Sequence, residues 1–227
     1  MWKFARTRVF ILVPCAYLAG CFIPSIGLDL GVRGKLLMGL TRVSGTNDLF
    51  AVASVEDNGW SNVTAIALSG DQQVSVNGVQ LIASIPGFPV YSGNLEAVDA
   101  PDHYAVAFDN SGDQQSMSVE PPDDFVDVHP AEGDSVSING FSQTWAPSGD
   151  SDVKVDIEIF GPDGVVGRLT NLADDGSINI SNSDLASLDT GDIRVVIRRF
   201  KEFDQEIGFA EGQVRLEIVK GANLNLE

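Results

Sequence analysis

The stretch VKVDIEI, residues 153 to 159, alternates apolar and charged residues with a period of two. The apolar set is Val153, Val155, Ile157 and Ile159, and the charged set is Lys154, Asp156 and Glu158. Because successive side chains of a strand point to opposite faces, the pattern predicts a strand with one buried and one wet face. VRLEI, residues 214 to 218, repeats it with Val214, Leu216 and Ile218 against Arg215 and Glu217.

Further β-rich runs are spread along the chain, at LFAVASV (49–55), VTAIAL (63–68) and YAVAF (104–108). VSVNGVQL (74–81) places Asn77-Gly78 between two short apolar segments, which predicts a hairpin turn. The turn clusters SGDQQ, DNSGD, GPDG, ADDGS and TGD separate the runs, and no sustained helical stripe occurs. The sequence therefore predicts an all-β fold of sandwich type.

Two tandem sandwich domains are the predicted organisation. The paired prolines of PPDD (121–124) cannot extend a central strand, so we place the boundary there. The expected segments are an N-terminal sandwich domain at 49–120, a C-terminal one at 121–221 and a tail at 222–227. Residues 21–48 are expected to be a tether or an edge strand, and 1–20 a signal peptide.

The C-terminal half resembles a fibronectin type III or immunoglobulin-like sandwich. VSINGFSQTWAPS (136–148), VKVDIEIFGPDG (153–164) and LASLDTGDIRVVIRR (185–199) look like its strands B, C and F. Trp145 and Pro147 match the tryptophan and proline that this family carries near the end of strand B, whereas Ile193 replaces the strand F tyrosine. The resemblance implies a sandwich and no particular chemistry.

The first 20 residues have the features of a secretory signal. A basic segment with Lys3, Arg6 and Arg8 precedes an apolar run, residues 9 to 20, which is too short to span a bilayer as a helix. The following LAGC, residues 18 to 21, resembles the lipobox of bacterial lipoproteins. The resemblance implies cleavage before Cys21, a diacylglyceryl group on its thiol and acylation of its amine; the alternative is a plain secretory signal.

Charge and cysteine content limit the kinds of partner and covalent cross-link that we expect for this protein. The chain has 14 basic and 32 acidic residues, and removal of three signal bases leaves 11 − 32 = −21. This charge excludes nucleic acid, which needs a positive patch. Cys15 would leave with the signal, so no disulfide framework is expected. Phe22 stands where an Asp would mark inner-membrane retention in the lipoprotein family, which favours the outer membrane, facing the periplasm or the cell surface.

No catalytic fingerprint is present, so we expect no enzyme activity, cofactor or metal. A site built from His103 and His129 with Asp102 or Asp127 is less favoured than two surface histidines. DNSGDQQSMSVE (109–120) has carboxylates at calcium-loop spacing, but Gln114 occupies the position that needs glycine, so we expect a β-hairpin. A calcium site on the acids Asp123, Asp124 and Asp127 is an alternative hypothesis.

The predicted function is a non-catalytic, lipid-anchored binding or structural module of the cell envelope. Its anchor is the membrane through Cys21, and its expected partner is an envelope protein or a glycan. Trp60, in EDNGWSN, is expected either to be exposed and stack on sugars or to lie in the core. The alternative function is an envelope hydrolase, or a glycan-binding protein, with carboxylates on its loops.

Overall fold

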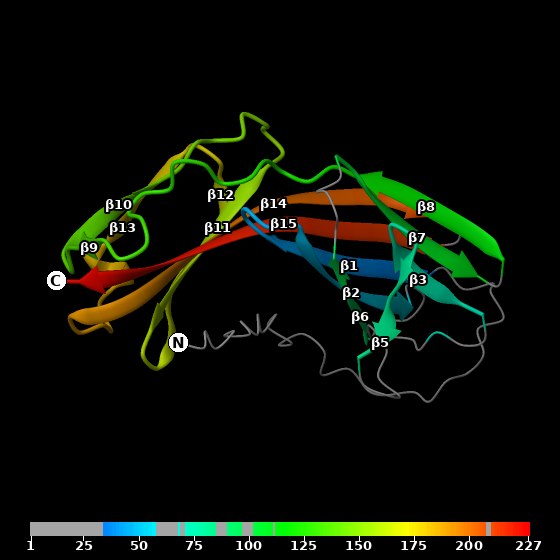
Figure 1. The fold of residues 1–227 in the computed structure, drawn as a ribbon, viewed down its shortest axis with the longest axis horizontal. Helices are drawn as coiled ribbons and strands as arrows, with labels where there is room; N and C mark the ends of the chain where they lie inside the picture. The colour runs from blue at the N-terminus through cyan, green and yellow to red at the C-terminus, as the bar shows by residue number, and fades with distance from the viewer. Residues whose placement is uncertain are drawn as a thin grey trace, which may run out of the picture.

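The computed structural model describes residues 34–57, 68, 71–84, 90–96, 102–110, 112–207 and 210–227. Fifteen strands and one short 3-10 helix, η1 (Asn182–Asp184), make up this part of the chain (Figure 1). The first strands are β1 (Gly34–Val43), β2 (Asp48–Asp57), β3 (Gln73–Val76), β4 (Val79–Gln80), β5 (Ile82–Ala83), β6 (Val90–Glu96), β7 (Tyr104–Asn110) and β8 (Asp113–Val119).

The remaining strands are β9 (Ser135–Val136), β10 (Gly140–Thr144), β11 (Lys154–Gly161), β12 (Gly164–Ala173), β13 (Ser177–Ser181), β14 (Gly191–Ile207) and β15 (Ala210–Leu226). The all-β prediction is confirmed. The period-two pattern also correctly predicts the buried face of β11, because Val155, Ile157 and Ile159 have no exposed surface. Within the described residues, no helix is long and apolar enough to cross a membrane.

A nine-stranded sheet runs the length of the molecule in the order β12-β11-β14-β15-β1-β2-β6-β5, with β9 added to β15. β14 and β15 pair antiparallel over their full 17 residues. At one end β14 pairs with β11, and at the other β15 pairs in parallel with β1. These two strands therefore belong to both halves of the molecule (Figure 1).

Each half is a sandwich with its own second layer. The four-stranded sheet β4-β3-β7-β8 covers one end of the long sheet, and the two-stranded sheet β10-β13 covers the other. Buried side chains from all three sheets form one continuous hydrophobic core. The sandwich prediction is thus confirmed, with a single core running through both halves.

The segments compared with strands B, C and F contain β10, β11 and the start of β14 in the C-terminal half. β11 and β14 are neighbours in one sheet, as strands C and F are in an immunoglobulin-like sandwich, while β10 lies in the opposite sheet. Trp145 is 4 % exposed and packs in the core between them.

The two expected hairpins are present. β3 and β4 pair around Asn77 and Gly78, whose φ angles of 50° and 77° are the left-handed values that a two-residue hairpin turn requires. β7 and β8 pair antiparallel, from Tyr104 opposite Val119 to Asn110 opposite Asp113. At the turn, the carboxylate of Asp109 accepts a hydrogen bond from the backbone N–H of Gly112. This confirms the hairpin interpretation of the calcium-like spacing.

The structure differs from the expected segment bounds at three places. Residues 34–43, expected as tether or edge strand, form β1, which has a partner strand on each side. Residues 222–226, expected as a tail, are the end of β15. The physical reason is the same in both cases: each segment carries apolar residues at alternate positions that the sheet buries, such as Leu36 and Leu224.

The third difference concerns PPDD. We placed the domain boundary at this segment, and Asp123 is indeed exposed, but Pro122 and the following Phe125 are buried. The segment crosses from one second-layer sheet to the other and is held against the long sheet by two arginines, Arg42 and Arg199. It therefore belongs to the packed body of the protein.

Candidate functional site

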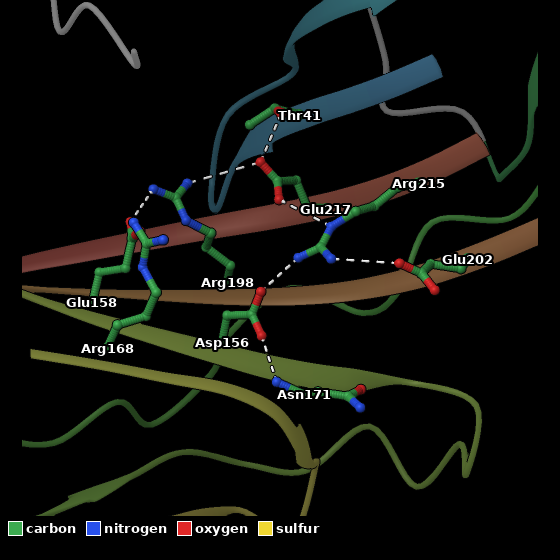
Figure 2. A network of polar contacts seen from close by, with 9 residues as sticks. All are labelled: Thr41, Asp156, Glu158, Arg168, Asn171, Arg198, Glu202, Arg215 and Glu217. Atoms are coloured by element: carbon green, nitrogen blue, oxygen red, sulfur yellow. Dashed lines mark hydrogen bonds and ion pairs between the residues drawn. The ribbon is translucent and has the colours of Figure 1, made fainter. Parts of the chain in front are cut away.

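The outward face of the long sheet carries a cluster of charged side chains, which we call the groove network. The alternation that buries Val155 and Ile157 turns Asp156 and Glu158 to this face. Arginines of adjacent strands lie beside them. The charged members are Asp156 and Glu158 of β11, Arg168 of β12, Arg198 and Glu202 of β14, and Arg215 and Glu217 of β15 (Figure 2).

Glu158 is the centre of one half of the network. Its two carboxylate oxygens lie 2.7 Å from Arg168 and 2.6 Å from Arg198. Arg198 also lies 3.8 Å from Glu217, which accepts a hydrogen bond of 2.8 Å from the Thr41 hydroxyl. These contacts connect five neighbouring strands, from β12 to β1, across the outward face.

Arg215 is the centre of the other half. Its guanidinium lies 2.7 Å from Asp156, 3.5 Å from Glu202 and 3.7 Å from Glu217. The guanidinium carbon sits 3.5 Å from the centre of the Phe200 ring, a favourable cation–π position. Contacts on several sides fix the orientation of this guanidinium before any ligand arrives.

The carboxylates of the network are less exposed than most of its arginines. Side chains of Asp156, Glu158 and Glu217 are 11 to 15 % exposed, whereas those of Arg168 and Arg215 are 49 % and 34 % exposed. Glu202, at 52 %, is the exposed acid. The network thus offers both guanidinium donors and a carboxylate acceptor to solvent.

The network forms one wall and part of the floor of a groove with a volume of about 540 Å³. The opposite wall is made by the outward residues of β1 and β2, including Leu37, Val52 and Ser54. Gly39 lies between Val52 and Arg215 in the strand register. A Cβ at Gly39 would meet no atom within 4 Å, so the groove is open at this position.

A second charged cluster lies on the inward face and is closed to solvent. Arg199 and Asp174 are 1 % and 2 % exposed, and the guanidinium Nε lies 3.1 Å from the carboxylate. Arg199 also donates to the backbone carbonyls of Asp123 and Asp124, at 2.9 and 3.1 Å, and stacks on Phe125 at 4.6 Å. This cluster holds the crossing segment in place and has no surface for a ligand.

Asp174 is ionised in this environment. Burial raises the pKa of its carboxyl, but hydrogen bonds from Ser148 and Trp145 and the charge of Arg199 outweigh that effect and lower the pKa overall. The carboxylate accepts from the Trp145 indole and from the Ser148 backbone N–H. It is therefore a structural acceptor that ties β10 and the β12–β13 turn to β14.

The candidate residues predicted from sequence are not gathered into one site. Cys21 and Trp60 lie outside the described residues. His103 and His129 are both exposed, and among the described side chains no group of three His, Cys, Asp or Glu could hold a metal ion. Of the three linker acids, Asp124 lies 3.3 Å from the buried Arg42 and is engaged there.

The groove network is what sequence reasoning missed. Asp156, Glu158, Arg215 and Glu217 were recognised as the wet faces of two strands, but nothing local shows that these strands share a face. The signal that the sequence does contain is one of opposite charge. Outward positions of β11 are acidic, and outward positions of β14 and β15 are basic, at Arg198 and Arg215. Recognising it requires the strand order.

No protein-family model and no curated protein sequence matches the chain. A solved structure described as "Biofilm associated protein - BSP domain" is similar to it, with a TM-score of 0.24 and 11 % sequence identity. The match covers 82 % of this chain and 29 % of that one, so this chain spans less than a third of the solved structure.

Proposed function

We propose that this protein is a lipid-anchored, non-catalytic binding module of the bacterial cell envelope. The observation that carries the proposal is the sequence Leu18-Ala19-Gly20-Cys21 after a short basic and apolar segment. Acyl chains on Cys21 would hold the protein at the outer membrane, because each buried methylene contributes about 0.8 kcal/mol and two or more chains make the attachment stable.

The net charge supports attachment through acyl chains in preference to electrostatics. At −18 for the whole chain, the protein is repelled by anionic headgroups. From Cys21 to Gly34, the first residue of β1, there are 34 − 21 = 13 residue steps, which reach at most about 45 Å when extended. An anchor at Cys21 would therefore keep the sandwich close to the bilayer.

The non-catalytic part of the proposal is supported by the state of the carboxyls. Glu132, Asp150, Asp174 and Asp184 have shifted pKa values, and in all four the shift is downward. Hydrogen bonds from neighbouring groups cause these shifts, for example from Lys201 to Asp150 and from Ser181 to Asp184. A general acid needs a raised pKa, so these groups suit structural roles.

The anchor is tested by comparing Cys21→Ala with the matched control Cys15→Ala in a Gram-negative host. We expect the wild type and Cys15→Ala to be recovered in outer-membrane vesicles, with an N-terminal peptide whose mass includes acyl chains on Cys21. Cys21→Ala should lose both properties. An unmodified Cys21 in the wild-type protein, or membrane recovery of Cys21→Ala equal to the wild type, would contradict the anchor.

Among the alternatives, one observation favours glycan binding. The carboxylates at the wall of the groove, Asp156, Glu158 and Glu217, are each within 3.8 Å of an arginine. Carboxylates paired with arginines in this way accept hydrogen bonds from hydroxyl groups. The groove is therefore suited to holding a polar ligand.

A further inference from the structure

We infer that the groove around Gly39 binds a neutral oligosaccharide. The inference rests on the proposed role as a binding module and names the ligand class of that module. The groove volume of about 540 Å³ lies within the range of roughly 300 to 1,000 Å³ that is typical of ligand sites in proteins. Its lining comes from six adjacent strands of one sheet, so the backbone that positions it is rigid.

The charge balance of the groove selects a neutral ligand. The arginines Arg168, Arg198 and Arg215 face four carboxylates, and each of the three is already paired with at least one of them. An anionic ligand would add charge to a site where acids are already in excess, within a protein of net charge −18. A cationic ligand would have to displace a paired guanidinium from its carboxylate.

Hydroxyl groups suit this environment because each both donates and accepts. Arg168 is half exposed and keeps guanidinium N–H groups beyond the one that pairs with Glu158, and these can donate to a sugar oxygen. Glu202, also half exposed, can accept from a sugar O–H. Thr170 and Ser54, at opposite sides of the groove, add two hydroxyls.

The wall formed by β1 and β2 supplies an apolar surface beside these polar groups. Leu37 and Val52 flank Gly39 on the outward face, and no side chain fills the place between Val52 and Arg215. A sugar ring has an apolar C–H face as well as hydroxyls. The open place at Gly39 allows that face to approach the backbone of β1 while the ring hydroxyls reach Arg215 and Glu202.

Gly39→Val tests the site directly. The added side chain would occupy open space, and valine favours a strand, so the fold is expected to tolerate it. Val43→Ile is the matched control, because Val43 lies on the same strand and face, is 42 % exposed and does not line the groove. A second pair is Arg168→Gln against Arg194→Gln, an exposed arginine outside the groove.

The full-length protein, in a non-glycosidic detergent, is titrated with maltotriose, cellotriose, chitotriose and the anionic trigalacturonic acid. We expect saturable binding of at least one neutral trisaccharide by calorimetry, weakened at least about tenfold by Gly39→Val and unchanged by Val43→Ile. Arg168→Gln should weaken binding and Arg194→Gln should not. Melting temperatures of all variants are measured alongside to show that each is folded.

Three results would overturn the inference: no binding of any neutral trisaccharide at millimolar concentration, tighter binding of trigalacturonic acid, or Gly39→Val that binds as the wild type does. The same titration on Cys21→Ala separates this inference from the proposed anchor. Binding by that variant supports the groove whatever the outcome of the acylation test. Acylation without trisaccharide binding removes the groove inference and leaves the anchor in place.

Discussion

At the scale of single residues, the buried arginine Arg199 is expected to contribute strongly to the stability of the fold. It neutralises Asp174 in a place closed to solvent and donates to the carbonyls of the crossing segment. A buried ion pair is not in itself strong evidence for stability, because desolvation of both charges offsets their attraction. Removal of one partner is different, since it leaves the other charged and unpaired.

We expect Arg199→Met to lower the free energy of unfolding by about 3 to 5 kcal/mol, because Asp174 loses its counter-charge and three backbone carbonyls lose their donor. Urea unfolding followed by circular dichroism measures the change. The double variant Arg199→Met with Asp174→Asn should recover part of the loss, since the buried charge is gone. Arg194→Met, an exposed arginine of the same strand, should change the stability by much less.

The lowered pKa of Asp174 predicts how stability depends on pH. A carboxyl whose pKa is lower in the folded state than in the unfolded one stabilises the fold above its unfolded value, which is about 3.9. That contribution is lost as the pH falls through the folded pKa. We therefore expect the unfolding free energy of the wild type to fall below about pH 4.

Asp174→Asn should be less stable than the wild type at pH 7, and the difference should shrink as the solution is acidified. The measurement is a series of urea titrations between neutral and strongly acidic pH. A difference that stays constant over the whole series would show that ionisation of Asp174 does not contribute. Asp175→Asn, a change at the neighbouring exposed acid, is the control.

At the scale of elements, two glycines with positive φ allow the energetic cost of backbone strain to be distinguished from the cost of a steric contact. Gly78 closes the β3–β4 hairpin with φ 77°, and a Cβ there would meet nothing within 4 Å. Gly140 begins β10 with φ 118°, and a Cβ there would lie 2.7 Å from the carbonyl oxygen of Ile180 in β13. Both positions favour glycine, but only Gly140 is also confined by a neighbouring strand.

Gly78→Ala should cost about 1 to 2 kcal/mol, the usual cost of a left-handed residue with a Cβ. Gly140→Ala should cost at least about 1 kcal/mol more, because β10 and β13 must move apart to admit the methyl group. Thermal unfolding of the two variants side by side measures the difference. Equal losses would mean that the β10–β13 pair is looser than the structure describes.

At the scale of the whole molecule, the shared strands β14 and β15 join the two sandwiches into one cooperative unit. β15 pairs with β1 over residues 210–219 and with β14 along its entire length. Neither sandwich can lose these strands without exposing the core of the other. The body is therefore expected to unfold in a single transition.

Leu36→Ala tests this coupling, because Leu36 is buried near the start of β1, where that strand pairs with the first residues of β15 in the half covered by the β4-β3-β7-β8 sheet. The substitution should cost about 2 to 5 kcal/mol. In a background where Trp2 and Trp60 are phenylalanine, the fluorescence of Trp145 reports on the other sandwich. We expect its urea midpoint to fall together with that of circular dichroism, whereas an unchanged Trp145 midpoint would show that the sandwiches unfold independently.

How much the sequence predicts depends on the range of the interaction. The alternation at residues 153–159 and 214–218 and the Asn77-Gly78 turn are local signals, and the structure confirms the strands and the hairpin they predict. Cys21 lies outside the described residues, so its lipidation stays a prediction from the lipobox. The groove network could not be predicted, because its residues come from strands that lie far apart in the sequence.

The sequence by itself determined that the described part of the chain is all-β, which face of the strands at residues 153–159 and 214–218 is buried, and where the Asn77-Gly78 turn lies. These features depend on the period-two geometry of a strand and on the φ angles that Asn and Gly tolerate. Only the tertiary structure decided that β1 lies between β15 and β2, that two strands serve both sandwiches and that opposite charges meet around a groove at Gly39. The physical reason is that alternation fixes which face of a strand is buried but not its neighbour, since that choice depends on long-range packing.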